Sequence, residues 1–142
     1  MPTNRSLHLM NAAHRGILRL TGGRLGWRFS GMPMLELTTT GRKSGQKRTT
    51  MLSSPLQRGD TIVIVASHGG DDAHPAWFLN LVDDLRVEVD FKGRGARPMR
   101  ANVADAAERA ELWPQVIRDH GNYAAYQRKT DREIPLVRLE PM

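Results

Sequence analysis

The chain has 142 residues, which fits one domain, and it contains no cysteine, so disulfide frameworks and thiolate zinc sites are excluded. Its net charge is +6, but residues 1–59 carry +9 with a single acid, Glu36, whereas residues 60–142 carry −3. This asymmetry indicates that the N-terminal part meets an anionic partner: a nucleic acid, an anionic membrane surface or a phosphorylated cofactor. The apolar runs are too short to span a bilayer and the first residues lack the apolar core of a signal peptide, so a cytoplasmic location is expected.

The first predicted element is an amphipathic helix over Leu7–Leu20, where apolar side chains recur at helical spacing. The glycines of Thr21–Gly23 suit the C-terminal cap of this helix. Arg5, Arg15 and Arg19 lie beside the apolar stripe. A peripheral contact with anionic lipid is therefore one hypothesis, and a helix packed on the rest of the domain is the more common outcome for such a pattern.

Strand patterns dominate the rest of the chain. Thr61–Ser67 is the clearest of them, because its side chains are β-branched and apolar on both faces, as in a buried strand. A connector over Gly26–Pro33 precedes six expected strands, namely Met34–Thr40, Lys47–Ser54, Thr61–Ser67, Leu85–Phe91, Ala96–Val103 and Ile134–Leu139. Helical patterns cover Pro75–Leu81, Ala104–Asp119 with a kink or break at Pro114, and Asn122–Lys129.

The order of these elements predicts an α+β fold that is mainly antiparallel. Links of hairpin length join the early strands, and strands do not alternate regularly with helices, which argues against a doubly wound parallel sheet. We expect a single domain over residues 1–142, with the N-terminal helix in residues 1–22. Residues 30–142 are expected to form a small β-barrel with two or three flanking helices.

A strongly basic turn lies between the first two expected strands. Its sequence, TTTGRKSGQKRTT over residues 38–50, holds four cations within seven residues: Arg42, Lys43, Lys47 and Arg48. Gly41 and Gly45 let the backbone turn and expose N–H groups, and hydroxyl donors come from Ser44, Thr49 and Thr50. These are the components of an anion site, although the spacing is not that of a Walker loop. The alternative is a solvated hairpin whose lysines keep the sheet edge soluble.

A second segment with ligand-binding character, VASHGGDDAHPAWFLNL, follows the buried strand. Ser67, His68 and the pair Gly69–Gly70 lie where that strand ends, and the glycines allow a flat ring to approach the backbone. No GxSxG elbow surrounds Ser67, so a nucleophilic serine is not expected. The spacing of His68 and His74 matches no zinc motif, so no metal site is expected, and loop histidines are more often surface residues.

Three motifs, TTTGRKSGQKRTT, VASHGGDDAHPAWFLNL and NYAAYQRKTDREIPLVRLEP, occur in the same order in the deazaflavin-dependent nitroreductase family of actinobacteria, which residues 9–142 resemble. The resemblance implies a split β-barrel similar to FMN-binding and pyridoxamine-phosphate-oxidase barrels. It also implies an oxidoreductase that passes a hydride from reduced coenzyme F420 to a quinone, a nitroaromatic or another activated, enone-like acceptor. That coenzyme carries a phosphodiester and a polyglutamate tail, so the anion site and the family's cofactor fall on the same residues.

The resemblance assigns individual positions as well. It places the phosphate and the start of the acidic tail on Arg42, Lys43, Ser44 and Arg48. It places the rest of the coenzyme on three segments, made of Thr49, Thr50, Met51, Leu52 and Ser53, then Val65, Ala66, Ser67 and His68, then Ala76, Trp77, Phe78, Leu79 and Asn80. Tyr126 lines the substrate face in this comparison, and Tyr123 can join it. We expect Tyr126 to supply the proton that follows the hydride, with Ser67 or solvent as the alternatives.

The sequence departs from the family pattern on the acceptor side. Met51 stands where the family commonly has proline, and Ser53–Pro55 replaces more apolar or aromatic residues. Arg128 and Lys129 stand where some members carry another aromatic residue. These changes concern the acceptor pocket rather than the phosphate site.

Two other classes of protein fit parts of the sequence. A flavin- or haem-binding barrel needs the basic turn for only one phosphate, and four cations exceed that need. A non-enzymatic nucleic-acid binder would use residues 1–59, where Trp27 and Phe29 are the only aromatic residues that could stack on bases. We therefore expect a small-molecule hydride acceptor as partner, no nucleic acid, and a monomer or a weak homodimer.

Overall fold

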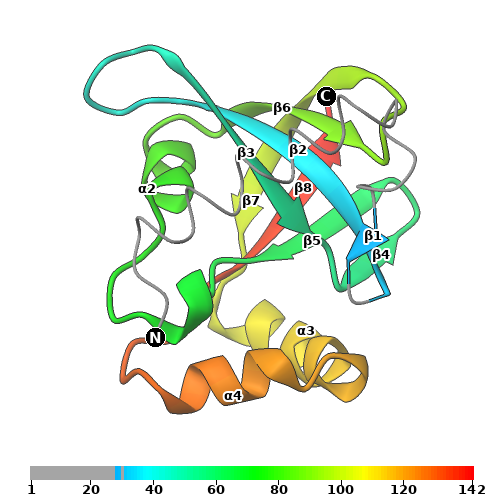
Figure 1. Cartoon of the computed structure of the whole chain (residues 1–142), viewed down its shortest axis with the longest axis vertical. Coiled ribbons are helices and arrows are strands. Elements are labelled where there is room, and N and C mark those ends of the chain that lie inside the picture. Colours follow the sequence, from blue (N-terminus) through cyan, green and yellow to red (C-terminus); the bar gives the residue numbers. More distant parts are fainter. Residues whose placement is uncertain (1–27, 30) are drawn as a thin grey trace.

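The computed structural model describes residues 28–29 and 31–142, so the expected N-terminal helix and its lipid contact lie outside the described residues. The described part is an antiparallel sheet with three α-helices (Figure 1). Its strands are β1 (Arg28–Phe29), β2 (Met32–Thr40), β3 (Lys47–Ser53), β4 (Leu56–Arg58), β5 (Thr61–Val65), β6 (Arg86–Phe91), β7 (Ala96–Val103) and β8 (Leu136–Pro141). Its helices are α2 (Ala76–Asp83), α3 (Ala106–Asp119) and α4 (Asn122–Arg128), and a 3-10 turn, η1 (His68–Gly70), follows β5. None of the described helices is long and apolar enough to cross a membrane.

Strand β2 organises the sheet. It pairs with β6 along one edge and with β3 along the other, and the strand order from β1 is β1-β2-β6-β7-β8-β5-β4. Side chains of β2 alternate between the two faces, so Leu35, Leu37 and Thr39 are buried while the residues between them are half-buried. The sheet curls around these inward side chains and those of its other strands (Figure 1). The prediction of a mainly antiparallel α+β fold is confirmed.

The helices lie in two places. Helix α2 packs against β2, and α3 and α4 lie side by side at one end of the sheet (Figure 1). The carboxylate of Asp105 accepts a hydrogen bond from the Glu108 N–H at 2.9 Å and so caps the first turn of α3. Of the kink or break expected at Pro114, the break is wrong, because α3 continues through this residue. Leu112 and Val116, on either side of that proline, are buried in the core beneath α3 and α4, which holds both halves of the helix in place.

The connector expected over Gly26–Pro33 is wrong in part. Residues Arg28 and Phe29 pair with Pro33 and Met32 across a turn at Gly31, whose φ is 77°. Strand β4 was also absent from the prediction. Both strands are only two or three residues long, so they carry no alternation that a sequence pattern can show.

Candidate functional site

The basic turn is a compact hairpin loop between β2 and β3. The Gly41 N–H donates to the Gln46 carbonyl and the Gly45 N–H donates to the Gly41 carbonyl, both at 2.8 Å. The Ser44 hydroxyl accepts from the Gln46 N–H at 3.1 Å. A side chain at Gly41 would place its Cβ 2.8 Å from the Ser44 Oγ and 3.2 Å from the Gln46 carbonyl oxygen, so a larger residue there would disturb the bonds that close the turn. The turn is therefore formed by its own hydrogen bonds and presents its charged side chains outward.

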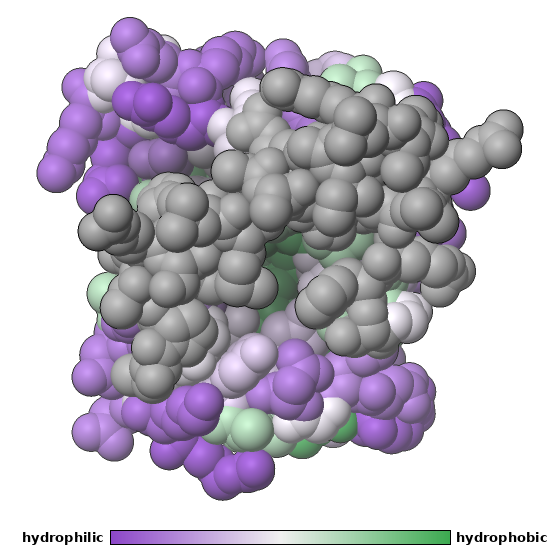
Figure 2. Space-filling model, viewed as in Figure 1, coloured by the Kyte–Doolittle hydropathy of each residue, from purple (hydrophilic) through white to green (hydrophobic). Residues whose placement is uncertain are grey.

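The cations of this turn are largely free of acids. Lys47 Nζ lies 3.1 Å from Glu88 Oε1 in an exposed ion pair. Arg42, Lys43 and Arg48 are exposed and make no ion pair with any described residue. The corner of the molecule that holds this hairpin is mostly hydrophilic (Figure 2). Three uncompensated cations beside main-chain N–H groups and hydroxyls favour an anionic ligand.

Asn80 of α2 joins the second segment to the basic turn. Its side-chain oxygen accepts from the Arg42 N–H at 3.1 Å and from the Arg42 guanidinium at 3.3 Å. Its side-chain nitrogen donates to the Thr39 hydroxyl at 3.3 Å, and Asn80 itself is only 6% exposed. Residues 38 positions apart in the sequence are thus held side by side. Nearby, the hydroxyls of Thr38 and Thr49 bond each other at 3.0 Å across β2 and β3.

The loop after β5 is tightly turned. His68, Gly69 and Gly70 have φ angles of 49°, 64° and 85°, which is the left-handed region that a residue other than glycine rarely adopts. The ring Nδ1 of His68 lies 2.9 Å from the Ala73 carbonyl, which helps hold this conformation. A Cβ at Gly70 would lie 2.8 Å from the Tyr126 carbonyl oxygen, so the loop directly abuts α4. The sequence suggested that these glycines let a flat ring approach the backbone; at Gly70 the close neighbour is the Tyr126 carbonyl.

The two tyrosines of α4 lie on the same side of the molecule as this loop. Tyr123 is buried and its hydroxyl lies 3.4 Å from the Ser53 hydroxyl and 3.7 Å from the Met32 sulfur. Burial raises the pKa of Tyr123, and the hydrogen bond from Ser53 opposes that rise. Tyr126 is half-buried and packs edge-on against Tyr123, with ring centroids 6.2 Å apart. Ser53, Tyr123, Tyr126 and the η1 turn therefore gather around one region.

Other expected ligand contacts differ in how much of the side chain is accessible. Met51, Val65, Ala66 and Phe78 are buried in the core, so a ligand could reach them mainly through backbone atoms. Trp77, Leu79 and Leu52 pack partly against the core and remain half-buried, while Ala76 is exposed. Trp77 and Phe78 meet edge-on at 6.3 Å, and Phe78 also lies 4.8 Å from the His74 ring. The exposed parts of this surface come from α2 and from β3.

Sequence reasoning missed Arg132. Its guanidinium binds the loop between β5 and α2 at four points, although some sixty positions separate it from that loop. The motif DREIP gave no reason to separate this arginine from its charged neighbours. The sequence holds no signal that would have identified it, because these contacts join segments that only the fold brings together.

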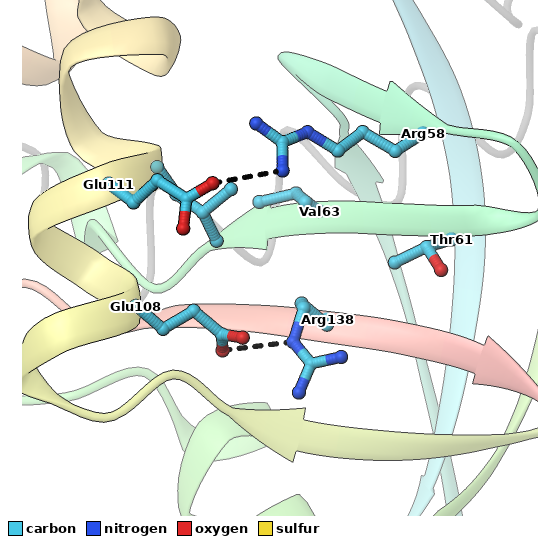
Figure 3. A pocket seen from close by; sticks show the side chains of 7 residues that line it. Arg58, Thr61, Val63, Glu108, Glu111 and Arg138 are labelled. Atoms are coloured by element: carbon cyan, nitrogen blue, oxygen red, sulfur yellow. Dashed lines mark hydrogen bonds and ion pairs between the residues drawn. The ribbon is translucent and has the colours of Figure 1, made fainter.

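A cleft on another part of the molecule has a different character. It has a volume of about 210 Å³, lies between α3 and strands β4, β5 and β8, and contains both arginines and glutamates. In Figure 3 each of its arginines meets a carboxylate, Arg58 with Glu111 at 3.5 Å and Arg138 with Glu108 at 2.9 Å. Arg138 also pairs with Glu140. Because these cations are already neutralised, the cleft is a poorer anion site than the basic turn.

Comparison with known proteins indicates a cofactor that fits the anion site of the basic turn. The sequence profile of the F420H(2)-dependent quinone reductase family matches residues 11–141. An F420H(2)-dependent quinone reductase of Mycobacterium tuberculosis is 41% identical over 132 residues, which cover 89% of this chain and 86% of that protein.

Two solved structures are similar to this chain in both sequence and fold. An F420-H2 dependent reductase, FDR-A, is 37% identical, with a TM-score of 0.66 over 76% of this chain and 94% of that one. A second solved structure, described as a domain-swapped dimer, is 33% identical with a TM-score of 0.67 over 91% of this chain and 96% of that one.

The family profile and the mycobacterial relative show that this class of protein is an oxidoreductase whose hydride donor is reduced coenzyme F420. The chain belongs to the F420H(2)-dependent quinone reductase family. It transfers hydride from reduced coenzyme F420 to quinones. The resemblance to the deazaflavin-dependent reductases is confirmed.

Proposed function

We propose that the hairpin Gly41–Arg48 holds the acidic end of coenzyme F420, and that the segment Ser67–Asn80 holds its ring. The observation that carries this proposal is the bond from Arg42 to Asn80, which places one end of the second segment against the turn that bears the free cations. An elongated ligand with an acidic end and a flat ring fits two adjoining surfaces of this kind.

The donor set matches the chemistry of the coenzyme. A phosphodiester with a glutamate tail carries several negative charges, and Arg42, Lys43 and Arg48 are exposed without an ion pair in the described part of the chain. A single phosphate would need fewer cations, so a simple flavin mononucleotide site is less well supported. Gly70 is buried and packs against the Tyr126 carbonyl of α4, so the half-buried residues Ser67 and His68 are the part of this loop that we propose for the ring.

We also propose that the curled sheet is a split β-barrel of the FMN-binding type. The support is the long central strand β2 paired on both edges, with short strands β1 and β4 at the extremities of the strand order. In this arrangement the ligand lies outside the barrel wall, on β3 and the loops, and not inside the apolar core. The buried side chains of Leu35, Leu37 and Val89 fill that core.

The hydride chemistry belongs to the coenzyme. The protein's part is to fix the ring, exclude water and place a proton donor near the acceptor. Tyr126 is our proposed donor, because its ring lies against Tyr123 and its backbone touches the η1 turn. Ser67 is the alternative, since its hydroxyl makes no hydrogen bond within the described residues. Tyr123 is the less suitable candidate, because its hydroxyl is engaged by Ser53 in a buried position.

The surface of the described residues is compatible with a monomer or a weak homodimer. Its exposed large apolar residues are scattered, at Val82, Val103 and Met142, rather than gathered in one patch. A domain-swapped dimer occurs among the solved relatives, so exchange of an element is the alternative. Sedimentation velocity over a range of concentrations distinguishes the two, because a swapped dimer does not dissociate on dilution within the experiment.

Titration of the protein with oxidised F420, followed by fluorescence, tests the central proposal. We expect Lys43→Ala and Arg48→Ala each to raise the dissociation constant by about tenfold, as for loss of one charge-assisted contact. Arg94→Ala is the matched control. It removes an exposed arginine, which makes no ion pair with a described residue, from the β6–β7 turn beside Met34, at the opposite end of β2 from the basic turn. Equal affinities in all three variants would overturn the assignment of the basic turn.

A further inference from the structure

The side chain of Arg132 connects two ends of the loop that follows β5. Arg132 lies between α4 and β8, and its Nε donates to the Asp71 carbonyl at 2.8 Å. One terminal nitrogen donates to the Ala66 carbonyl at 3.2 Å and the other to the Ser67 carbonyl at 2.9 Å. Three carbonyls separated by up to five positions along the loop are thus fixed by one planar group.

Arg132 is itself held in place. Its carbonyl accepts from the Gln127 side-chain amide at 2.8 Å, and its N–H donates to the Thr130 hydroxyl at 3.3 Å. The Gln127 side-chain oxygen accepts in turn from the Ile134 N–H at 2.9 Å. Gln127 thereby ties the segment between α4 and β8 back to α4 at Arg132 and at Ile134, so the backbone that carries the guanidinium is fixed.

The loop that Arg132 binds adopts a conformation that needs support. Three successive residues, His68, Gly69 and Gly70, have positive φ. His68 is the strained one, because its Cβ makes the left-handed conformation sterically unfavourable. The Ser67 carbonyl accepts from the Gly70 N–H at 2.9 Å, which closes the turn, and the same carbonyl accepts from Arg132. Arg132 therefore bonds to the atom on which the turn depends.

The charge of Arg132 is suited to this task. Burial lowers the pKa of Arg132 and the carboxylates of Asp71 and Asp72 raise it, and an arginine remains protonated at physiological pH in any case. Its hydrogen bonds to the carbonyls are consequently charge-assisted. A lysine carries the same charge but lacks the planar fork, so it cannot reach the three carbonyls at once.

We propose that Arg132 is a positioning residue that holds the loop Ala66–His74 in the shape that receives the coenzyme ring. This inference rests on the proposed function, which places Ser67 and His68 beside that ring. Arg132 touches neither coenzyme nor acceptor in this account. It acts through the loop backbone, by presenting a formed surface before the ligand arrives.

Comparison of Arg132→Lys and Arg132→Gln with Arg138→Lys tests the proposal. Arg138 is a suitable control because it is, like Arg132, a partly exposed arginine, but it lies on β8 facing the cleft of Figure 3 and its partners are carboxylates rather than the loop after β5. Three quantities are measured in each protein: hydrogen exchange of the Gly70 and Asp71 amides, the dissociation constant of oxidised F420, and the urea midpoint. Steady-state kinetics add the KM for reduced F420 and the KM for a soluble quinone.

We expect both Arg132 variants to exchange these two amides at least about tenfold faster and to bind F420 about tenfold more weakly, as for loss of a charge-assisted bond. The KM for reduced F420 should rise while the KM for the quinone is unchanged. Arg138→Lys should leave exchange and coenzyme affinity at wild-type values, because Arg138 does not contact the loop after β5. If Arg132→Gln and Arg132→Lys change exchange and F420 affinity alike, the effect does not come from misfolding of one variant.

Wild-type affinity for F420 in Arg132→Lys would overturn the inference, whether or not the loop amides exchange faster. Equal rises in both KM values would also overturn it, since a general loss of structure affects both substrates. A wild-type protein that fails to bind F420 would overturn the proposed function, and with it this inference. The two failures are therefore distinguishable, because only the first leaves the wild-type titration intact.

Discussion

The main-chain N–H and the guanidinium of Arg42 both donate to the side-chain oxygen of Asn80, at 3.1 and 3.3 Å. This pair fixes the distance between the basic turn and helix α2. Part of the Arg42 hydrogen-bonding capacity is thereby used within the protein, whereas Lys43 and Arg48 are exposed and make no ion pair with a described residue.

Substitution of Asn80 separates its structural role from the charge of the site. Asn80→Ala leaves the Thr39 hydroxyl and the Arg42 N–H without a partner, so we expect the free energy of unfolding to fall by about 1–3 kcal/mol. Asn80→Asp keeps an acceptor for Arg42 but adds a negative charge beside the anion site, so stability should change less while F420 affinity falls. Urea unfolding and fluorescence titration measure the two effects. Wild-type affinity in Asn80→Asp would show that the coenzyme's anionic end lies elsewhere.

Gly70 is expected to be the least replaceable glycine of the η1 turn. Alanine there combines a φ of 85° with a Cβ placed 2.8 Å from the Tyr126 carbonyl, so Gly70→Ala should cost more than about 2 kcal/mol. Gly59→Ala is the control, because Gly59 has a φ of 59° and nothing within 4 Å of the added Cβ, so its cost is that of the φ angle alone, about 1 kcal/mol. Thermal unfolding of the two variants compares them. Equal losses would mean that α4 moves away from the loop at little cost.

Tyr123 gives the protein a pH dependence at the alkaline end. Burial raises its pKa in the folded state above the value of about 10 in the unfolded state. The folded state then holds a proton that the unfolded state has lost, so the free energy of unfolding falls as the pH rises above about 10. Tyr123→Phe should be less stable at pH 8, because it loses the bond to Ser53, but should lose less further stability between pH 9 and pH 11. Urea midpoints over that range test this, and parallel curves would contradict it.

His74 gives the opposite dependence at the acid end. Burial lowers the pKa of His74, and the nearby charge of Arg132 lowers it further. The unfolded state takes up a proton near pH 6.5, before the folded state does, so stability is complete above that pH and falls as the pH drops below it. His74→Gln should flatten this decline, since glutamine keeps an acceptor for the Arg132 guanidinium at this position. Unfolding midpoints at pH 5, 6 and 7 provide the measurement, and an unchanged slope would assign the decline to other groups.

Strong local patterns predicted most of the fold. The six strands expected from alternation or from β-branched runs all occur, because in each of them the side chains that face the core recur at the spacing of a strand. The two strands that were missed, β1 and β4, are only two and three residues long and each pairs with the next strand across a short turn, so their own residues carry little information. Pro114 shows the reverse effect, since its local preference against a helix is overruled by the burial of Leu112 and Val116.

The sequence predicted which segments form the candidate site, but not the contacts between those segments. Charge density and glycines marked Arg42–Arg48, and the end of a buried strand marked Ser67–Gly70. The contacts between Arg42 and Asn80 and between Arg132 and Ser67 depend on how the sheet brings distant segments together. A single charged residue such as Arg132 is indistinguishable in sequence from its exposed neighbours, since only the fold decides which of them is half-buried.

The hydrogen bonds that close the basic turn on itself have a thermodynamic consequence. Because Gly41, Ser44 and Gln46 already fix the backbone of the loop, association with a flexible acidic chain takes little conformational entropy from the protein. The ordering falls on the ligand, whose glutamate tail loses its freedom on a surface that does not rearrange. Affinity should then depend on how many tail charges reach the cations, and each further glutamate beyond their reach should add almost nothing.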